Sequence, residues 1–101
     1  DYLFNLLSNE LNSKDYIDSL RHKGMLFAIE LKSQGKTKDA ELAQKLADHL
    51  LSTGIVVWQG YGHRKDGSGL FFLLAPPLNI SRRESKLIVK ICSSGLKGFY
   101  E

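Results

Sequence analysis

The chain has 101 residues, of which 43% are hydrophobic and 25% are charged, the composition of one ordinary globular domain. Its 14 basic and 11 acidic residues are interleaved and give a net charge of only +3, which argues against a clustered nucleic-acid-binding surface. No apolar run approaches the roughly 18 residues that a membrane span requires, and no signal-peptide pattern is evident. We therefore expect a cytoplasmic protein without nucleic-acid or membrane partners.

The only cysteine and the only methionine of the chain each support a prediction. Cys92 is the only cysteine, so it cannot form an internal disulfide, and its place in an apolar helical pattern predicts a small buried hydrophobe. The sequence begins with Asp1, and its only methionine is Met25. We therefore expect this chain to be a piece of a longer polypeptide.

The first elements in chain order are a helix and two strands. Residues 2–11 carry leucines at helical spacing and predict a short amphipathic helix. Residues 16–21 predict a short strand, and Gly24 then interrupts the pattern. Residues 25–31, MLFAIEL, are apolar at consecutive positions, which predicts a central strand that is buried on both faces.

A polar turn at residues 32–39 leads into a helix and another strand. Thr37 is the expected N-cap of the helix, and Gly54 is expected just after its last turn. One apolar stripe marks its buried face: Ala43, Leu46, Ala47, Leu50 and Leu51. The β-branched run at residues 55–58 predicts the next strand.

The last part of the chain contains a glycine-rich loop at residues 59–69, a strand at residues 70–75 and a final helix. The strand is apolar throughout, which predicts burial on both faces. Ser81 and Glu84 form a capping-box sequence, S-x-x-E, at the start of the helix. The predicted apolar stripe of this helix consists of Leu87, Ile88, Ile91, Cys92, Leu96 and Phe99.

A pair of prolines joins the last strand to the last helix. Pro76 keeps Ala75 extended, and neither Pro76 nor Pro77 can donate to a neighbouring strand, so the sheet should end there. We expect this stiff connector to brace against the rest of the protein, with Leu78 and Ile80 packing onto the core. The elements together predict an α+β fold: a small antiparallel or mixed sheet of three to four strands with about three helices.

Three motifs in this order resemble class III pyridoxal-phosphate-dependent aminotransferases. Residues 20–31, LRHKGMLFAIEL, resemble the family signature VRGKGLMLGIEL. Residues 50–58, LLSTGIVVW, resemble the helix end and the GV.V strand that follow it. Residues 74–84, LAPPLNISRRE, resemble the later motif aPPL.It..E. The resemblance covers roughly residues 16–100 of the chain.

The resemblance implies that residues 1–101 are one domain, the C-terminal small domain of a longer enzyme. Residues 1–15 would then be a helix that continues from the missing large domain. The parent enzyme would use pyridoxal phosphate to transfer an amino group between an amine or amino acid and a keto acid. This segment would shape the substrate pocket and support a homodimer.

The sequence also departs from the family pattern. His22 and Ala28 stand where the family favours glycine. Many members carry an arginine shortly before the Pro-Pro strand that binds a substrate carboxylate. At the equivalent spacing this sequence has Asp66 and Gly67, and Arg64 lies two residues earlier.

The glycine-rich loop holds the candidate substrate-binding residues. In a complete enzyme the loop would lie near the substrate entrance, where Tyr61, His63 and Arg64 could contact substrate. The alternatives are a flexible hairpin connector, or a phosphate-binding loop. Phosphate binding is disfavoured because such loops usually precede a helix, whereas this one precedes a strand.

No catalytic or cofactor-binding residue is expected in this segment. A Schiff-base lysine must be desolvated to be nucleophilic, and no lysine here lies in a family-like lysine motif. The resemblance places that lysine in the large domain. His22, His49 and His63 lack metal-ligand spacing, so no metal site is expected.

The remaining motif residues are expected to be structural. Arg21 would hold the turn beside Gly24. Glu30 lies within an apolar strand, where a buried acid needs a partner, so we expect it to pair with Arg21 or a lysine. The other structural motif residues are Pro76, Pro77 and Ser81.

Two alternatives from other classes stay open. Lys23, Gly24 and Phe27 partly match the RNA-recognition-motif strand that stacks bases on exposed aromatic rings. The second alternative is a free-standing α+β module that binds a ligand or a protein. An aminotransferase fragment should expose apolar surface where its large domain sits, whereas a self-sufficient module should have a polar exterior.

Overall fold

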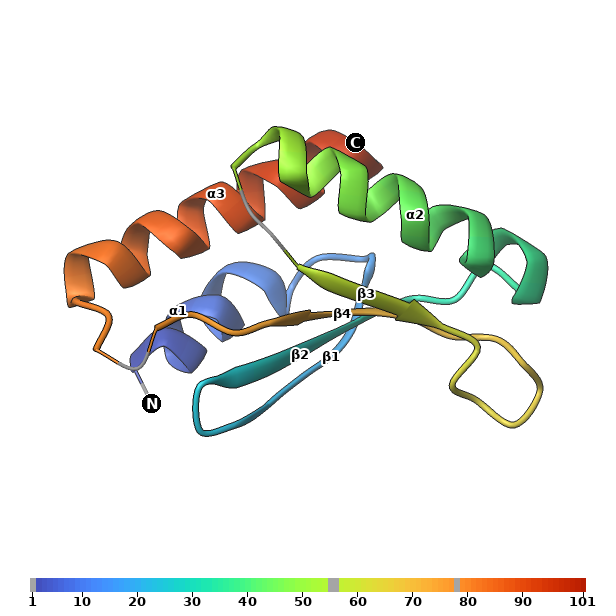
Figure 1. The fold of residues 1–101 in the computed structure, drawn as a ribbon, viewed down its shortest axis with the longest axis horizontal. Helices are drawn as coiled ribbons and strands as arrows, with labels where there is room; N and C mark the ends of the chain where they lie inside the picture. Colours follow the sequence, from blue (N-terminus) through green and yellow to red (C-terminus); the bar gives the residue numbers. More distant parts are fainter. Residues whose placement is uncertain (1, 55–56, 78) are drawn as a thin grey trace.

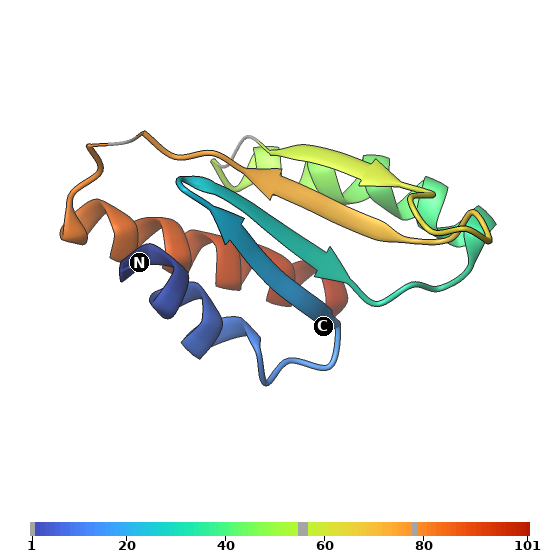
Figure 2. The same ribbon diagram turned by 90° about the horizontal axis from the view of Figure 1, so that it is seen from below.

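The computed structural model describes residues 2–54, 57–77 and 79–101 of the chain. In this part, three helices lie on one face of a four-stranded sheet, as Figures 1 and 2 show. The elements in chain order are α1 (Tyr2–Leu11), β1 (Ile17–Lys23), β2 (Leu26–Leu31), α2 (Lys36–Ser52), β3 (Trp58–Tyr61), β4 (Leu70–Leu74) and α3 (Arg82–Tyr100). The predicted α+β fold class is confirmed.

The sheet is antiparallel throughout, with the strand order β1-β2-β4-β3. β1 and β2 form a hairpin whose turn contains Gly24 at φ 58°, a conformation that glycine adopts without strain. β2 and β4 pair at the centre although a helix and a strand separate them in sequence. The predicted central position of β2 is therefore confirmed.

Each central strand has one covered face and one open face. Phe27 and Ile29 of β2 and Phe72 of β4 are buried beneath the helices. The intervening residues are more exposed, and Leu26 at the start of β2 is 46% exposed. The prediction that both strands are buried on both faces is wrong, because all three helices pack against the same side of the sheet.

Helix α2 begins earlier than its sequence predicts. Its N-cap is Gly35, and Thr37 lies within the first turn, so the predicted Thr37 cap is wrong. The Asp39 carboxylate instead accepts hydrogen bonds from the Ser33 hydroxyl and the Gln34 amide, which lie just before the helix. The end of the helix is as predicted, because Gly54 follows the last turn with φ 98°.

Helix α3 begins with the predicted capping box, in which Ser81 and Glu84 satisfy each other's backbone amides. Its buried stripe differs from the prediction: Leu87 is 56% exposed and Val89 is buried instead. The inward face consists of Ser85, Val89, Cys92, Gly95 and Leu96. Gly95 lets α3 approach α2 closely, because a Cβ there would lie 2.8 Å from Leu50 Cδ2. A pattern of hydrophobic residues does not predict this contact. Burial of Cys92, as predicted, raises the pKa of its thiol to about 12.

Strand β3 lies later than the β-branched run predicts. Residues 55–56 of that run are outside the described part, and the strand comprises Trp58–Tyr61, three residues of which were assigned to the loop. Gly60 pairs with Phe71, whose ring covers it: a Cβ on Gly60 would lie 2.2 Å from Phe71 Cζ. Glycine therefore belongs to this strand because a neighbouring side chain occupies its space.

The proline connector ends the sheet as predicted, since β4 stops at Leu74. Pro76 is half-buried and Pro77 is exposed, and the amide of Ile80 donates to the Pro77 carbonyl at 3.3 Å. Ile80 is half-buried, whereas the predicted packing of Leu78 falls outside the described residues. Within the described part, no helix has the length and apolar character that a bilayer span requires.

Candidate functional site

The loop between β3 and β4 is an ordered hairpin end, shorter than the predicted loop. The Gly62 amide donates to the Gly69 carbonyl at 3.1 Å, and the Arg64 amide donates to the Ser68 carbonyl at 3.0 Å. The Gly67 amide closes the tip on the Arg64 carbonyl at 2.9 Å. These bonds give the loop, residues 62–69, a defined backbone path from which its side chains project.

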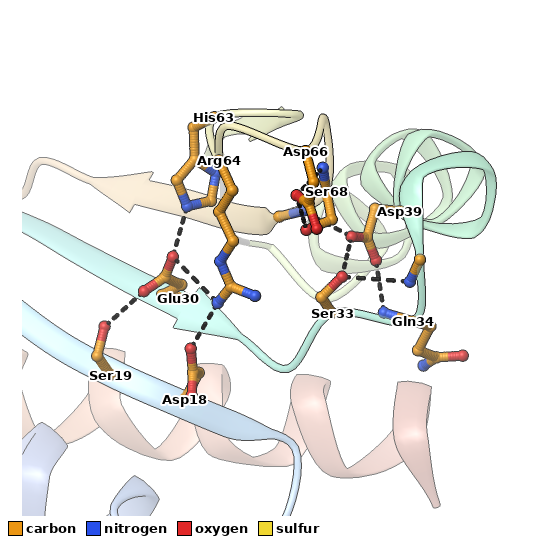
Figure 3. Close-up of polar contacts among 12 residues, drawn as sticks. Asp18, Ser19, Glu30, Ser33, Gln34, Asp39, His63, Arg64, Asp66 and Ser68 are labelled. Carbon is orange, nitrogen blue, oxygen red and sulfur yellow. Dashed lines mark hydrogen bonds and ion pairs between the residues drawn. The ribbon is translucent and has the colours of Figure 1, made fainter.

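His63 turns back from this loop over the open face of the sheet (Figure 3). Its Nε2 lies 2.5 Å from Oε2 of Glu30 on β2. The ring meets Phe71 edge to face, with 5.0 Å between the centroids. It also packs on Gly69, where a Cβ would lie 2.4 Å from the imidazole. Gly69 has φ 124°, so both its backbone conformation and the close ring require glycine.

Glu30 is the centre of a polar cluster on the open face. Ser19 of β1 donates to its Oε1 at 3.0 Å, His63 contacts its Oε2, and Arg64 Nη2 lies 3.6 Å from the same oxygen. Burial on its own would raise the pKa of Glu30, but the bonds from His63 and Ser19 and the Arg64 charge outweigh it and lower the pKa. The predicted pairing of Glu30 with Arg21 or a lysine is therefore wrong.

Arg64 links the loop to the edge strand. Its Nη2 donates to Asp18 Oδ2 at 2.7 Å, and both side chains are more than a third exposed. A pair this exposed contributes at most about 1 kcal/mol to stability. Because Glu30 lies beside the same guanidinium, Arg64 faces two carboxylates, one from β1 and one from β2.

Asp39, in the first turn of α2, is a second anchor of the loop. It is fully buried, and its carboxylate accepts from Ser33 Oγ at 2.5 Å, the Gln34 amide at 2.8 Å and the Gly69 amide at 2.7 Å. Burial would raise its pKa, but these bonds and the Arg64 charge lower it. Asp39 thus ties the start of α2 to the base of the loop. Its position in the first turn of a predicted helix was the only sequence signal.

The structure separates Tyr61 from the other two candidate substrate-binding residues. Tyr61 pairs with Leu70, which is buried on the helix-covered face, so Tyr61 projects to that side. His63 and Arg64 both lie at Glu30 on the opposite face. The candidate site therefore consists of His63 and Arg64 with Glu30.

In the described part of the chain, the Arg21 side chain lacks the contact that was expected to hold the turn beside Gly24. The Arg21 side chain is exposed and makes no hydrogen bond or ion pair with any other described residue. At the adjoining turn, His22 Nδ1 instead lies 3.3 Å from the Gly24 carbonyl. Arg21 pairs with Ala28 across the hairpin and so projects from the open face.

The open face around the polar cluster is apolar. Trp58 of β3 is 60% exposed, and Leu73 beside it is half-buried. Ala28 and Phe71 are also half-buried, and Leu26 is exposed at the far end of β2. The exposed face of this sheet therefore carries a continuous band of apolar side chains across β2, β4 and β3, with the Glu30 cluster at one end. We call this band the open apolar face.

The residues present do not fit the internal Schiff base of pyridoxal phosphate. Every lysine of the chain is exposed except Lys14, which is half-buried, so none has the desolvated setting that a nucleophilic lysine requires. In the described part, no group of three or more His, Cys, Asp or Glu side chains could hold a metal ion. The chemistry available here is therefore binding and positioning.

The proposed match to an RNA-binding strand fails at its central residue. Phe27 would have to project from the sheet to stack on a base. It is only 1% exposed and lies under the helices, against the ring of His22. The aromatic side chains of the open face come from β3 and β4 instead.

No protein-family model matches the sequence, and neither does any curated protein. Solved aminotransferase structures share the fold. The chain matches an ornithine aminotransferase of Plasmodium yoelii with TM-score 0.72 and 23% identity, over 96% of this chain and 22% of that one. It matches an aminotransferase of Bacillus anthracis with TM-score 0.75 and 23% identity, over 95% and 22%.

A transaminase from a marine Virgibacillus gives TM-score 0.77 and 21% identity, over 97% of this chain and 22% of that one. The chain thus spans about a fifth of the length of these relatives, 22% in each case. At these identities the likeness establishes the fold. This chain is similar in fold to one small part of an aminotransferase.

Proposed function

We propose that this chain is the small domain of a class III pyridoxal-phosphate-dependent aminotransferase. The parent enzyme would transfer an amino group between an amine or amino acid and a keto acid. Two supports are independent of each other: the ordered trio of sequence motifs, and a fold that matches transaminases over nearly the whole chain but over about a fifth of theirs. A cytoplasmic location and a homodimeric parent belong to the same proposal.

The open apolar face is the structural observation that most directly supports a further domain packed against this one. A sheet of a stable domain normally buries at least one face, and here the helices already do so. The second face nevertheless exposes large apolar side chains, Trp58 and Leu26 among them. Monomeric proteins rarely leave a contiguous apolar band uncovered without a use for it. In the proposed enzyme the large domain of the same polypeptide covers this face.

The proposed role of the chain is to shape the substrate entrance. His63 and Arg64 lie at one end of the open apolar face, where a covering domain would meet the loop. Because no lysine here fits the cofactor, the large domain would supply the Schiff-base lysine and the phosphate site. The small domain would contribute a wall, which excludes water and limits which substrates enter.

The proposal is tested on the full-length polypeptide that contains this chain. It should be purified with pyridoxal phosphate and assayed for amino transfer against a panel of amines, amino acids and keto acids, with absorbance of the bound Schiff base as a second readout. We expect both an absorbing Schiff base and amino transfer. A full-length protein that binds no pyridoxal phosphate would contradict the proposal.

A further inference from the structure

The loop at residues 62–69 is held to the rest of the domain near both of its ends. Near its C-terminal end, the Gly69 amide donates to the buried carboxylate of Asp39 on α2. Near its N-terminal end, two residues after β3, the His63 imidazole reaches Glu30 on β2, 33 residues away in sequence. A loop so rich in glycine would otherwise be mobile, because glycine loses the most backbone entropy on ordering.

Two neighbours restrict the His63 imidazole, and its one side-chain hydrogen-bond partner among the described residues is Glu30. Gly69 blocks one side of the ring, and the Phe71 ring flanks it edge to face. The bond to Glu30 requires a proton on Nε2, so in the neutral ring Nδ1 is the acceptor. Glu30 therefore sets both the orientation of the ring and its tautomer.

Glu30 is itself held in place. Ser19 occupies its other oxygen at 3.0 Å, so the carboxylate cannot rotate freely. The side chain is 14% exposed, which strengthens its bonds relative to bonds in open solvent. Arg64 lies 3.6 Å from the same oxygen that His63 contacts and is anchored by Asp18. One carboxylate thus holds the two candidate substrate-binding side chains together, as Figure 3 shows.

We propose that Glu30 is a positioning residue that latches the loop of residues 62–69 onto the open face of the sheet. His63 and Arg64 are then already in place when the large domain and the substrate meet this face. The latch is a property of this chain, whereas its effect on amino transfer rests on the proposed function. Preset side chains avoid the entropy of ordering a loop during binding.

The latch is tested by hydrogen–deuterium exchange with mass spectrometry on the full-length polypeptide. In Glu30→Gln, the neutral amide keeps the shape of the side chain but loses its charge, so its contacts with His63 and Arg64 are no longer charge-assisted. Loss of one charge-assisted bond corresponds to about tenfold faster exchange in peptides covering residues 62–69. The matched control is Glu41→Gln, which changes an exposed glutamate on α2 and should leave this exchange unchanged.

A second variant guards against a folding defect in Glu30→Gln. His63→Phe acts from the loop, where the side chain is a third exposed; it keeps a ring beside Phe71 but has no donor for Glu30, and it should accelerate exchange in the same peptides. The double variant should add little to either single change, because both weaken the same contact. Unchanged loop exchange in a folded Glu30→Gln or in His63→Phe would overturn the latch.

The positioning role has its own readout in the amino-transfer assay. Glu30→Gln should raise KM severalfold while kcat changes less than twofold, because the latch prepares binding and takes no part in chemistry. Faster loop exchange without any change in KM would overturn the positioning role. If the wild type showed no amino transfer, the proposed function would be wrong, and the exchange rates would still decide whether the latch exists.

Discussion

The two faces of the sheet differ although the same strands build both. On the covered face, Phe72 of β4 is fully buried under the helices. On the open face, its neighbour Leu73 is half-buried and the adjacent Trp58 is 60% exposed. Both faces are apolar, so composition alone cannot tell which of them the chain covers by itself. The contrast shows that the helices of this chain cover one apolar face of the sheet and leave a second one partly exposed.

The largest expected loss of stability comes from a substitution on the covered face. Phe72→Ala should lower the free energy of unfolding of the chain by about 3–5 kcal/mol, because it removes a fully buried ring and leaves a cavity. Leu73→Ala on the open face should lower it by less than half as much. Urea titrations of both variants measure the difference. Equal losses would mean that the open face is also packed.

Asp39→Asn should have the next largest effect, about 2–3 kcal/mol, since the new NH₂ group would oppose a backbone amide, of Gln34 in one orientation and of Gly69 in the other. The pH dependence is a sharper test. The folded-state pKa of Asp39 is lowered, so its contribution is fully present above the unfolded value of about 3.9 and is lost as the pH falls through the folded value. Melting temperatures measured below about pH 4 should therefore fall less steeply in Asp39→Asn than in the wild type.

Gly60→Ala tests the open face from the edge strand. The new Cβ would lie 2.2 Å from Phe71 Cζ, so the ring must move, and overpacking of this kind costs about 1–3 kcal/mol. The double variant with Phe71→Leu should recover part of the loss, because the shorter side chain leaves room. A Gly60→Ala variant as stable as the wild type in thermal denaturation would show that the Phe71 ring does not cover β3.

Ser81→Ala measures the effect of a local contact at the start of α3, which involves neither face of the sheet. It removes one half of the capping box of α3 and should lower the free energy of unfolding by about 1 kcal/mol. Ser81→Thr, which keeps a hydroxyl at the N-cap, is the matched control and should be nearly as stable as the wild type. A loss in Ser81→Ala as large as that of Phe72→Ala would mean that the covered face contributes less than its burial implies.

The sequence predicts the parts of the fold that depend on local chemistry. The box at Ser81 and the glycine after α2 both function as predicted, because each requires only residues within one helical turn. The start of α2 was misplaced because Asp39, and not Thr37, binds the polar groups just before the helix, and the Asp39 side chain also binds Gly69, 30 residues away in sequence. The β-branched run at residues 55–58 likewise gave no hint that Gly60 would belong to a strand.

The candidate site was predicted only as a set of residues. His63 and Arg64 were recognised in the loop, but Glu30 was expected to pair with Arg21 or a lysine. Its side-chain partners are instead Ser19, His63 and Arg64. His63 and Arg64 come from the far end of the β3–β4 hairpin, and only the pairing of β2 with β4 brings them to Glu30. A single sequence does not encode that pairing in any local pattern.

The most direct test of the account compares the solvent exposure of Trp58 in two contexts by hydroxyl-radical footprinting and mass spectrometry. We predict that Trp58 is oxidised readily in the 101-residue chain and is protected severalfold in the full-length polypeptide, because the proposed large domain would cover the open apolar face. Leu51, 58% exposed on α2, is the control for general reactivity and should be modified equally in both. Equal oxidation of Trp58 in the two proteins would contradict the account.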